Sequence, residues 1–172
     1  LLALLPALTP ARALPADAIA PLDGADPALF PVSSELHVAT HFWRRVYTEI
    51  DTDEGFLHDS RHLGVVYETL TLTQDLSRRE RSRRLRKRIA HYRQILEKLA
   101  GGRRQGLDDE SARVLALWPA DVSNATLADA ARSIRFQRGQ ADRFVAGLER
   151  SGAWLDYIEA QFEARGLPGE LA

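Results

Sequence analysis

Residues 76–100 read LSRRERSRRLRKRIAHYRQILEKLA, and this stretch decides the fold class of the chain. Its apolar residues recur at alternating steps of four and three positions, which places them on one face of a helix. They are Leu85, Ile89, Tyr92, Leu96 and Leu99. Gly101 and Gly102 follow directly, and glycine is common just beyond the end of a helix. The sequence therefore predicts one long amphipathic helix over residues 76–100.

The residues before this helix predict a shorter helix and then a β-hairpin. Over residues 35–49 apolar side chains recur at three- and four-residue spacing, which is typical of a helix. The residues of this apolar face are Leu36, Phe42, Trp43, Val46, Tyr47 and Ile50. Residues 51–55 break the pattern, and residues 56–58 and 64–70 are rich in the β-branched and aromatic side chains that favour strands. Two strands alone are marginal in water, so we expect helices to lie against the hairpin.

The residues after the long helix predict three more helices. One begins after Asp108 and is stopped by Pro119, the next covers about residues 123–150 with Gly139 as a candidate break, and the last is capped by Ser151. We expect their inward side chains to be Val114, Leu115, Trp118, Leu127, Ala131, Ile134, Ala141, Phe144, Val145, Leu148, Trp154, Leu155, Ile158 and Phe162. The predicted fold is mainly α: an irregular multi-helix domain of about five helices with one β-hairpin.

The first 33 residues differ in character from the rest. Residues 1–8 form a short apolar run, and Ala11-Arg12-Ala13 is the kind of triplet after which a signal peptidase cuts. The run is too short to span a bilayer, which takes about 20 apolar residues. We interpret residues 1–13 as the remnant of a signal peptide, with a disordered apolar leader as the alternative. Residues 14–33, rich in Ala, Pro and Asp, indicate a flexible linker, and the helical domain then covers residues 34–166.

The composition is that of one folded domain, with 172 residues of which 45% are hydrophobic and 27% charged. The formal net charge of −1 gives no overall field that would attract nucleic acid or an anionic membrane, so an electrostatic role must come from local clustering. The chain has no cysteine, which excludes disulfides, thiolate metal sites and cysteine nucleophiles.

One local cluster of charge lies at the start of the long helix, where residues 78–88 hold eight basic residues and a single acidic one, Glu80. The basic residues are Arg78, Arg79, Arg81, Arg83, Arg84, Arg86, Lys87 and Arg88. They fit a solvated helix face, contact with anionic lipid headgroups or cell-wall carboxylates, or nucleic-acid binding. No aromatic side chain interleaves the run, as stacking on single strands would require, and the export signal also argues against nucleic acid. A solvated helix face is the first interpretation, contact with the envelope or with anionic lipid is the partner role that these residues could also fill, and no nucleic acid is expected.

No catalytic, cofactor-binding or metal-ligating residue is predicted. His37 and His41 have the spacing of a helical metal pair, but Val38 stands where a zinc protease would place its glutamate. His58 and His62 fall in the predicted hairpin, where a four-residue spacing does not bring two side chains to one metal ion. Helical spacing alone cannot select a glycosidase pair from 24 acidic residues.

Six stretches carry a family resemblance through their order along the chain. They are residues 42–49 (FWRRVYTE), 55–59 (GFLHD), 63–68 (LGVVYE), 135–144 (RFQRGQADRF), 151–154 (SGAW) and 165–172 (RGLPGELA). In this order they resemble the region upstream of the catalytic domain in the membrane-bound lytic murein transglycosylase D-like family. The resemblance covers about residues 35–172, and none of the stretches is a catalytic signature.

The resemblance implies part of an exported enzyme, periplasmic or associated with the outer envelope, that cleaves peptidoglycan glycan strands. In that family the stretch matched by residues 165–172 opens a lysozyme-like catalytic domain, so residues 167–172 are expected to be its truncated start. The family's catalytic glutamate follows a few residues later, and Glu170 matches a different glutamate. That later residue protonates the glycosidic oxygen and then deprotonates the muramyl 6-hydroxyl, which gives 1,6-anhydromuramyl products without hydrolysis.

The resemblance therefore leaves this piece a supporting role, in which it positions a catalytic domain. Trp43, Tyr47, Trp118, Trp154 and Phe162 are expected to serve as apolar packing, with sugar stacking as the alternative for any that are exposed. Phe162 and Leu167 are expected to face the catalytic domain. Two other functions stay open: a non-catalytic periplasmic interaction module that uses the basic 78–88 face, and a cytoplasmic nucleic-acid binder if the apolar start is not a signal.

Overall fold

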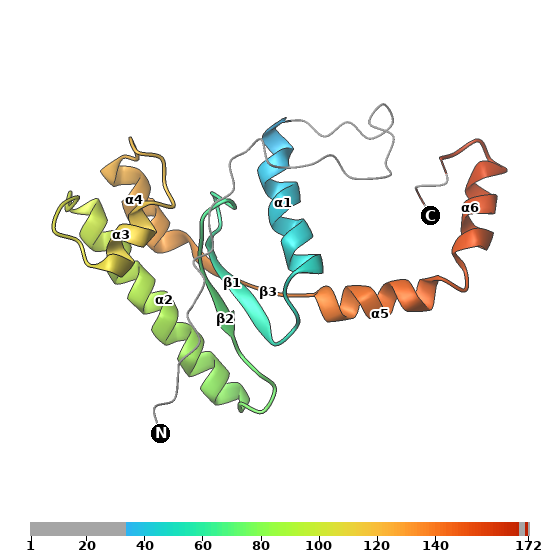
Figure 1. Ribbon diagram of the computed structural model, residues 1–172, viewed down its shortest axis with the longest axis horizontal. Helices are drawn as coiled ribbons and strands as arrows, with labels where there is room; N and C mark the ends of the chain where they lie inside the picture. Colours follow the sequence, from blue (N-terminus) through green and yellow to red (C-terminus); the bar gives the residue numbers. More distant parts are fainter. Residues whose placement is uncertain (1–33, 169–170, 172) are drawn as a thin grey trace, which may run out of the picture.

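The computed structural model describes residues 34–168 and residue 171, and it confirms the mainly α class. The helices and strands, in chain order, are α1 (Ser34–Thr48), β1 (Glu54–Asp59), β2 (Val66–Thr71), α2 (Arg78–Ala100), α3 (Asp109–Leu115), α4 (Asn124–Ser133), β3 (Ile134–Arg138), α5 (Ala141–Ser151) and α6 (Leu155–Glu163) (Figure 1). The predicted signal remnant over residues 1–13 and the linker over residues 14–33 lie outside the described residues, as do Glu170 and most of the predicted start of a catalytic domain.

The predicted hairpin is confirmed, but the sheet has a third strand that the sequence analysis missed. The strands are ordered β2-β1-β3, and both pairings are antiparallel. The prediction of one helix over residues 123–150 is wrong for residues 134–138, which form β3. In β3 the residues Ile134 and Phe136 pair with Asp59 and Leu57 of β1. The free edge of β1 thus gains hydrogen bonds, and this tertiary pairing outweighs the local helical pattern.

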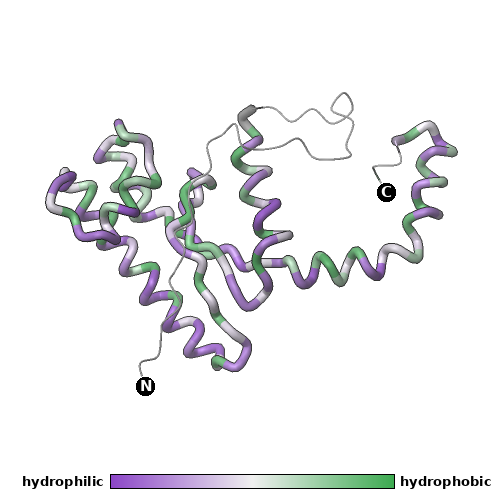
Figure 2. Tube along the Cα trace, viewed as in Figure 1, coloured by the Kyte–Doolittle hydropathy of each residue, from purple (hydrophilic) through white to green (hydrophobic). Residues whose placement is uncertain are grey.

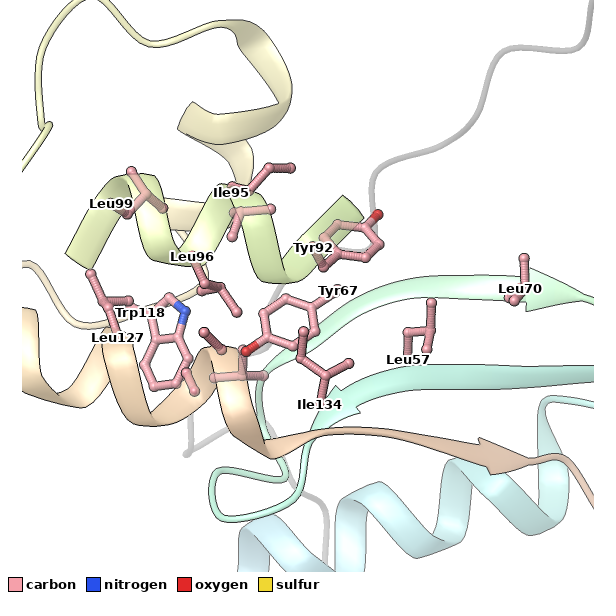
Figure 3. Close-up of a cluster of buried hydrophobic side chains, with 14 of the residues drawn as sticks. Leu57, Tyr67, Leu70, Tyr92, Ile95, Leu96, Leu99, Trp118, Leu127 and Ile134 are labelled. Carbon is pink, nitrogen blue, oxygen red and sulfur yellow. The ribbon is translucent and has the colours of Figure 1, made fainter. Parts of the chain in front are cut away.

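The sheet lies between helices on its two faces (Figure 1). Leu57, Tyr67 and Leu70 face α2 and α4, where they join the larger of two hydrophobic clusters together with Leu96 and Leu127 (Figure 3). Phe42, Val46, Ile50, Phe56 and Val66 make the smaller cluster, which packs α1 against the opposite face. The hairpin therefore has the helical support that two strands require.

An irregularity in the pairing of β1 with β2 brings two adjacent β2 side chains toward α2. His58 pairs with Val66 but Leu57 pairs with Glu68, so Tyr67 is the extra residue between them. Successive strand residues normally point to opposite faces, and a bulge breaks that alternation. Tyr67 consequently stacks on Tyr92 of α2, while the carboxylate of Glu68 accepts a hydrogen bond from Arg88.

The long amphipathic helix is confirmed. Its first turn carries a capping box, in which the Ser77 hydroxyl accepts from the Glu80 backbone N–H and the Glu80 carboxylate accepts from the Ser77 backbone N–H. Of its apolar stripe, Tyr92, Leu96 and Leu99 are buried, and Leu85 and Ile89 pack against the same cluster at its edge. Gly101 ends the helix, as its position predicts.

Several predicted inward side chains are in fact exposed. Phe42 and Val46 of α1 are buried as expected, as is Ile50 just after it, but Leu36, Trp43 and Tyr47 lie on the solvent side. Of the tryptophans expected in the core, only Trp118 is buried, just beyond the end of α3 at Leu115, whereas Trp43 and Trp154 are exposed. A wide apolar face on a short helix thus exceeds what one sheet face can cover.

The last two helices depart most from expectation. Ser151 is the last residue of α5 and does not cap α6, and its hydroxyl donates back to the Leu148 carbonyl. Ala141 is the only buried residue of α5, and α6 has none. Figure 1 shows both helices leading away from the sheet and its covering helices. We call α5 and α6, residues 141–163, the arm, and residues 34–140 the body.

Candidate functional site

The arm carries a row of apolar side chains that nothing in the described chain covers. The most exposed on α5 are Val145 at 54% and Leu148 at 56%; Trp154, just before α6, is 65% exposed, and Tyr157 on α6 is 64% exposed. Figure 2 shows the alternation of apolar and polar residues along both helices. The other exposed apolar residues of this region are Phe144, Leu155, Ile158 and Leu167. Large apolar side chains that stay exposed together on one element of a folded protein are typical of interaction surfaces.

Aromatic side chains connect this surface with the core under α1. The rings of Phe144 and Tyr47 have centroids 5.7 Å apart, and those of Tyr47 and Trp43 are 6.3 Å apart. Trp43 in turn meets the buried Phe42 edge to face at 5.4 Å. The expectation that Trp43 and Tyr47 are interior packing residues is therefore wrong. They form an exposed aromatic strip where the arm leaves the body.

The junction between the arm and the body is held tightly. The backbone N–H groups of Gln140 and Ala141 donate to the carbonyls of Val46 and Ile50, at 2.8 and 3.0 Å. The Asp142 carboxylate accepts from the hydroxyl and the backbone N–H of Thr52, at 2.6 and 3.1 Å. These hydrogen bonds lower the pKa of Asp142, so that this carboxyl is ionised near neutral pH.

Gly139 makes this close junction sterically feasible. A Cβ atom at this position would lie 2.2 Å from the carbonyl oxygen of Ile50 and 2.4 Å from that of Asp51. Both neighbours are backbone atoms, which cannot move aside as a flexible side chain can. Gly139, predicted as a candidate break in a helix, is the first residue after β3, where the chain passes against the segment that follows α1.

A polar cluster surrounds Asp59 at the hairpin turn. The Asp59 side chain is fully buried, and its Oδ1 accepts from the backbone N–H groups of Arg61 and His62, each at 2.8 Å. The same oxygen lies 3.1 Å from Nδ1 of His62, whose ring packs edge to face on Trp118. An aspartate that binds the backbone two and three residues ahead is the standard way to fix such a turn.

Three buried polar atoms of this cluster and its neighbourhood have no hydrogen-bond partner among the described residues: Asp59 Oδ2, Tyr67 OH and Trp118 Nε1. Burial raises the pKa of the Tyr67 hydroxyl, and the Asp59 charge adds to the effect. His58 lies on the other face of the sheet against Phe42, and burial lowers its pKa. The dominant role of Asp59 is to hold the turn, and the short Asp-Ser run at this point is the sequence signal for it.

A second polar network joins α2 to β2 and α3. Arg88 donates to the carboxylates of Glu68 and Glu110, at 2.8 and 3.4 Å, and to the Tyr92 hydroxyl at 3.2 Å. His91 meets the other oxygen of Glu110 at 2.8 Å. Burial opposes ionisation of Glu110, but the His91 hydrogen bond and the neighbouring charges outweigh it and lower its pKa. All of these groups satisfy one another, so the network is a structural link between the elements.

The basic run at the start of α2 is only partly free for a partner. Arg88 belongs to the network just described, and Arg81 donates to the carbonyls of Thr73, Gln74 and Leu76. The six others are exposed and have no ion pair within the described part of the chain: Arg78, Arg79, Arg83, Arg84, Arg86 and Lys87. We call these six residues the basic end of α2.

No protein-family model, curated protein or solved structure matches this chain.

Two further findings bear on the site. Over residues 34–168 and residue 171, no three His, Asp or Glu side chains lie close enough together to hold a metal ion. Within the same described part, no helix has both the length and the apolar character that crossing a membrane takes. The features with an evident capacity for interaction are therefore the exposed apolar face of the arm and the basic end of α2.

Proposed function

We propose that this chain is the region upstream of the catalytic domain in an exported lytic murein transglycosylase, and that it supports and positions that domain. The observation that carries the proposal is the uncovered apolar face of the arm. Val145, Leu148 and Ile158 lose the benefit of burial as long as nothing packs on them. Burying one such side chain completely is worth about 1.5–3 kcal/mol, so a domain docked on this face would be held firmly.

The order of the family-like stretches supports the same assignment. Residues 42–49 and 135–144 form the two sides of the junction between arm and body, where Tyr47 contacts Phe144. Residues 151–154 connect the two arm helices, and residues 165–172 come directly after the arm. In the resembled family the last stretch opens the lysozyme-like domain, so the arm would be the element that delivers the chain to it.

The proposed role is supportive and not catalytic. In the resembled family the acid/base glutamate follows the stretch matched by residues 165–172, and Glu170 is not its counterpart. The substrate of the whole enzyme would be the peptidoglycan glycan strand, cleaved without hydrolysis to 1,6-anhydromuramyl products, in the periplasm or at the outer envelope. The 172-residue chain alone would leave purified cell-wall sacculi intact, and release of anhydro-muropeptides by it would refute the proposal.

A decisive test extends this chain with the family's catalytic domain and changes only the arm. Replacing Val145 and Leu148 together by glutamine removes apolar contact area from two exposed positions. We expect a lower rate of anhydro-muropeptide release and a lower unfolding temperature of the catalytic domain. The matched control replaces Glu149 and Arg150, exposed polar residues of the same helix, by glutamine. If both double variants keep full activity and stability, the arm does not support the catalytic domain.

A further inference from the structure

The charges of this chain are strongly separated along the molecule. The sequence has 23 basic and 24 acidic residues. Residues 78–88 hold eight of the basic residues and one of the acidic residues, so the rest of the chain has 15 basic and 23 acidic residues. Outside residues 78–88, residues 34–140 hold 11 basic and 14 acidic residues, so the near-neutral net charge includes one concentrated positive region on a body that is otherwise close to neutral. Such a distribution orients a molecule in front of an extended anionic surface, because one end is attracted far more strongly than the rest.

The basic end of α2 lies where side chains can reach a partner. Figure 1 shows the first turns of α2 running past α3 and α4 to one end of the body, and Figure 2 shows this part as hydrophilic. The helix turns its apolar stripe to the core, so the charged side chains occupy the remaining surface. The one acidic residue, Glu80, is occupied by hydrogen bonds from the backbone and hydroxyl of Ser77.

The basic side chains surround the helix and do not line a single groove. Arg79, Arg83 and Arg86 border one shallow hollow, and a second is bordered by Arg83, Arg84 and Lys87 next to Leu76. A third hollow, between α2 and β3, is bordered by Arg78 and Arg81 together with Arg138 of β3. Cationic groups are therefore presented in several directions around the end of the helix.

We propose that the basic end of α2 docks this protein on an anionic phospholipid surface. Five of its six residues are arginines, whose planar guanidinium groups bind the two free oxygens of a phosphodiester in a bidentate manner. A cluster of four to eight basic residues on a helix is the typical feature by which proteins recognise anionic lipid. Because α2 uses its apolar face for the core, the contact is electrostatic and does not involve insertion of the helix.

The arrangement favours a surface over a nucleic-acid strand. Residues 78–88 contain no aromatic side chain on which bases could stack. A strand or duplex is best held along one groove or stripe, whereas here the arginines point to several sides of the helix end. A plane of lipid headgroups contacts such an end from any side, and it leaves the nearly neutral remainder of the body facing solution.

The direct test uses the 172-residue chain and lipid vesicles in a sedimentation assay. We expect the chain to sediment with vesicles that contain about one third phosphatidylglycerol, and not with vesicles of phosphatidylcholine alone. Binding at about 0.05 M salt should disappear at about 0.5 M salt, since the Debye length falls from roughly 13 Å to roughly 4 Å. Equal binding to both vesicle types, or binding that persists at the higher salt concentration, would overturn the proposal.

A pair of triple variants separates clustered charge from net charge. The first carries Arg79→Gln, Arg83→Gln and Arg86→Gln, and we expect its vesicle affinity to fall by roughly 100-fold, at about fivefold for each basic residue. The control carries the same charge change at three scattered, exposed positions, as Arg44→Gln, Arg103→Gln and Arg143→Gln. Its affinity should fall far less. An equal loss in both variants would show that no docking surface exists at the end of α2.

Two competing binding partners are tested in the same format. Glutamine has nearly the helix propensity of arginine, so both triple variants should keep the thermal unfolding curve of the parent chain. If the chain binds duplex DNA or purified sacculi in a manner that depends on Arg79, Arg83 and Arg86, but does not bind the anionic vesicles, the lipid proposal is refuted. None of these variants changes the apolar face of the arm, so failure of this proposal is distinct from failure of the supporting role.

Discussion

Two helices of this chain have similar amphipathic patterns but opposite surroundings. In α2 the apolar stripe packs on the sheet, and Leu96 and Leu99 have no exposed surface. In α5 the apolar residues Val145 and Leu148 are more than half exposed. Helical periodicity therefore shows which face of a helix needs a partner, but it does not show whether that partner belongs to the same folded unit.

The difference also divides the chain into parts of unequal stability. The body has two buried clusters on the two faces of a sheet, so its elements open only with the core. The arm is held through its first residues, by the backbone of Gln140 and Ala141 and by the Asp142 carboxylate. Segments with few buried contacts open at low free energy, so the arm should behave as a separate, weaker unit until something covers it.

The largest expected effect is a loss of folding stability when a side chain is removed from the core of the body, compared with the same removal on the arm. Leu96→Ala removes a fully buried side chain from the centre of the larger cluster, and we expect it to lower the free energy of unfolding by about 2–5 kcal/mol. Leu148→Ala, the same substitution on the arm, should change it by less than about 0.5 kcal/mol. Urea unfolding followed by circular dichroism measures both. Similar losses would mean that the arm is part of the cooperative core.

The next largest effect on stability is expected at the junction between arm and body, and two glycine substitutions test it. Gly139→Ala places a Cβ against the carbonyl oxygens of Ile50 and Asp51, so the backbone must shift, and we expect a loss of about 1–3 kcal/mol. Gly147→Ala is the matched control, because the nearest atom to its new Cβ is 3.9 Å away. Within α5 alanine should stabilise the helix by up to about 1 kcal/mol. A neutral result at Gly139 would show that β3 and α1 are less closely packed than the structure indicates.

Much of this fold is predictable from local patterns, and β3 shows where they fail. The stripe from Leu85 to Leu99 and the β-branched hairpin both show a periodicity that is complete within a short stretch of the sequence, so their element type is predictable although their packing partners are not. Residues 134–138 continue an apolar helical pattern, yet Ile134 and Phe136 also alternate with polar neighbours as a strand requires. Whether residues 134–138 form a helix or a strand depends on the free edge of β1, about 75 positions earlier in the sequence, and no local pattern contains that information.

The candidate functional surfaces could also be predicted only in part from the local sequence. The basic run over residues 78–88 is visible in the sequence, but the fact that Arg81 and Arg88 are used internally depends on the carbonyls before α2 and on Glu68 of β2. Exposure of Trp43 and Trp154 was not predictable either, since a periodic apolar face has the same appearance with or without a covering element. The role of Asp59 in holding the turn had a local signal in its sequence, but its burial had none.

The stability of the body should depend on pH through His58. Burial holds the pKa of this ring below its ordinary value of 6.5, although the neighbouring Asp59 acts in the opposite direction. The folded chain therefore binds fewer protons than the unfolded chain below about pH 6.5, and the free energy of unfolding falls as the pH drops toward the folded pKa. His41, whose pKa is also lowered by burial and by two arginines, contributes with the same sign.

The measurement compares unfolding curves at pH 7.5 and at pH 5.5, roughly one unit on either side of the ordinary histidine pKa. His58→Gln should make the difference between the two pH values smaller than in the parent chain, whatever it does to stability at pH 7.5. Because the His58 ring packs on Phe42 of the smaller cluster, this dependence belongs to the body and not to the arm. A pH dependence that is unchanged in the variant would assign the effect to other groups.

The smallest expected effect lies at the contact where body and arm meet. The rings of Tyr47 and Phe144 are 5.7 Å apart, but both side chains are more than 40% exposed. A double-mutant cycle with Tyr47→Ala and Phe144→Ala should give a coupling energy of about 0.5 kcal/mol, at the low end for aromatic pairs. A value above about 1.5 kcal/mol would mean that this contact already fixes the arm on the body. The weak coupling expected here is what leaves the apolar face of the arm available to a partner, because a face held tightly by its own body could not adjust to a second surface.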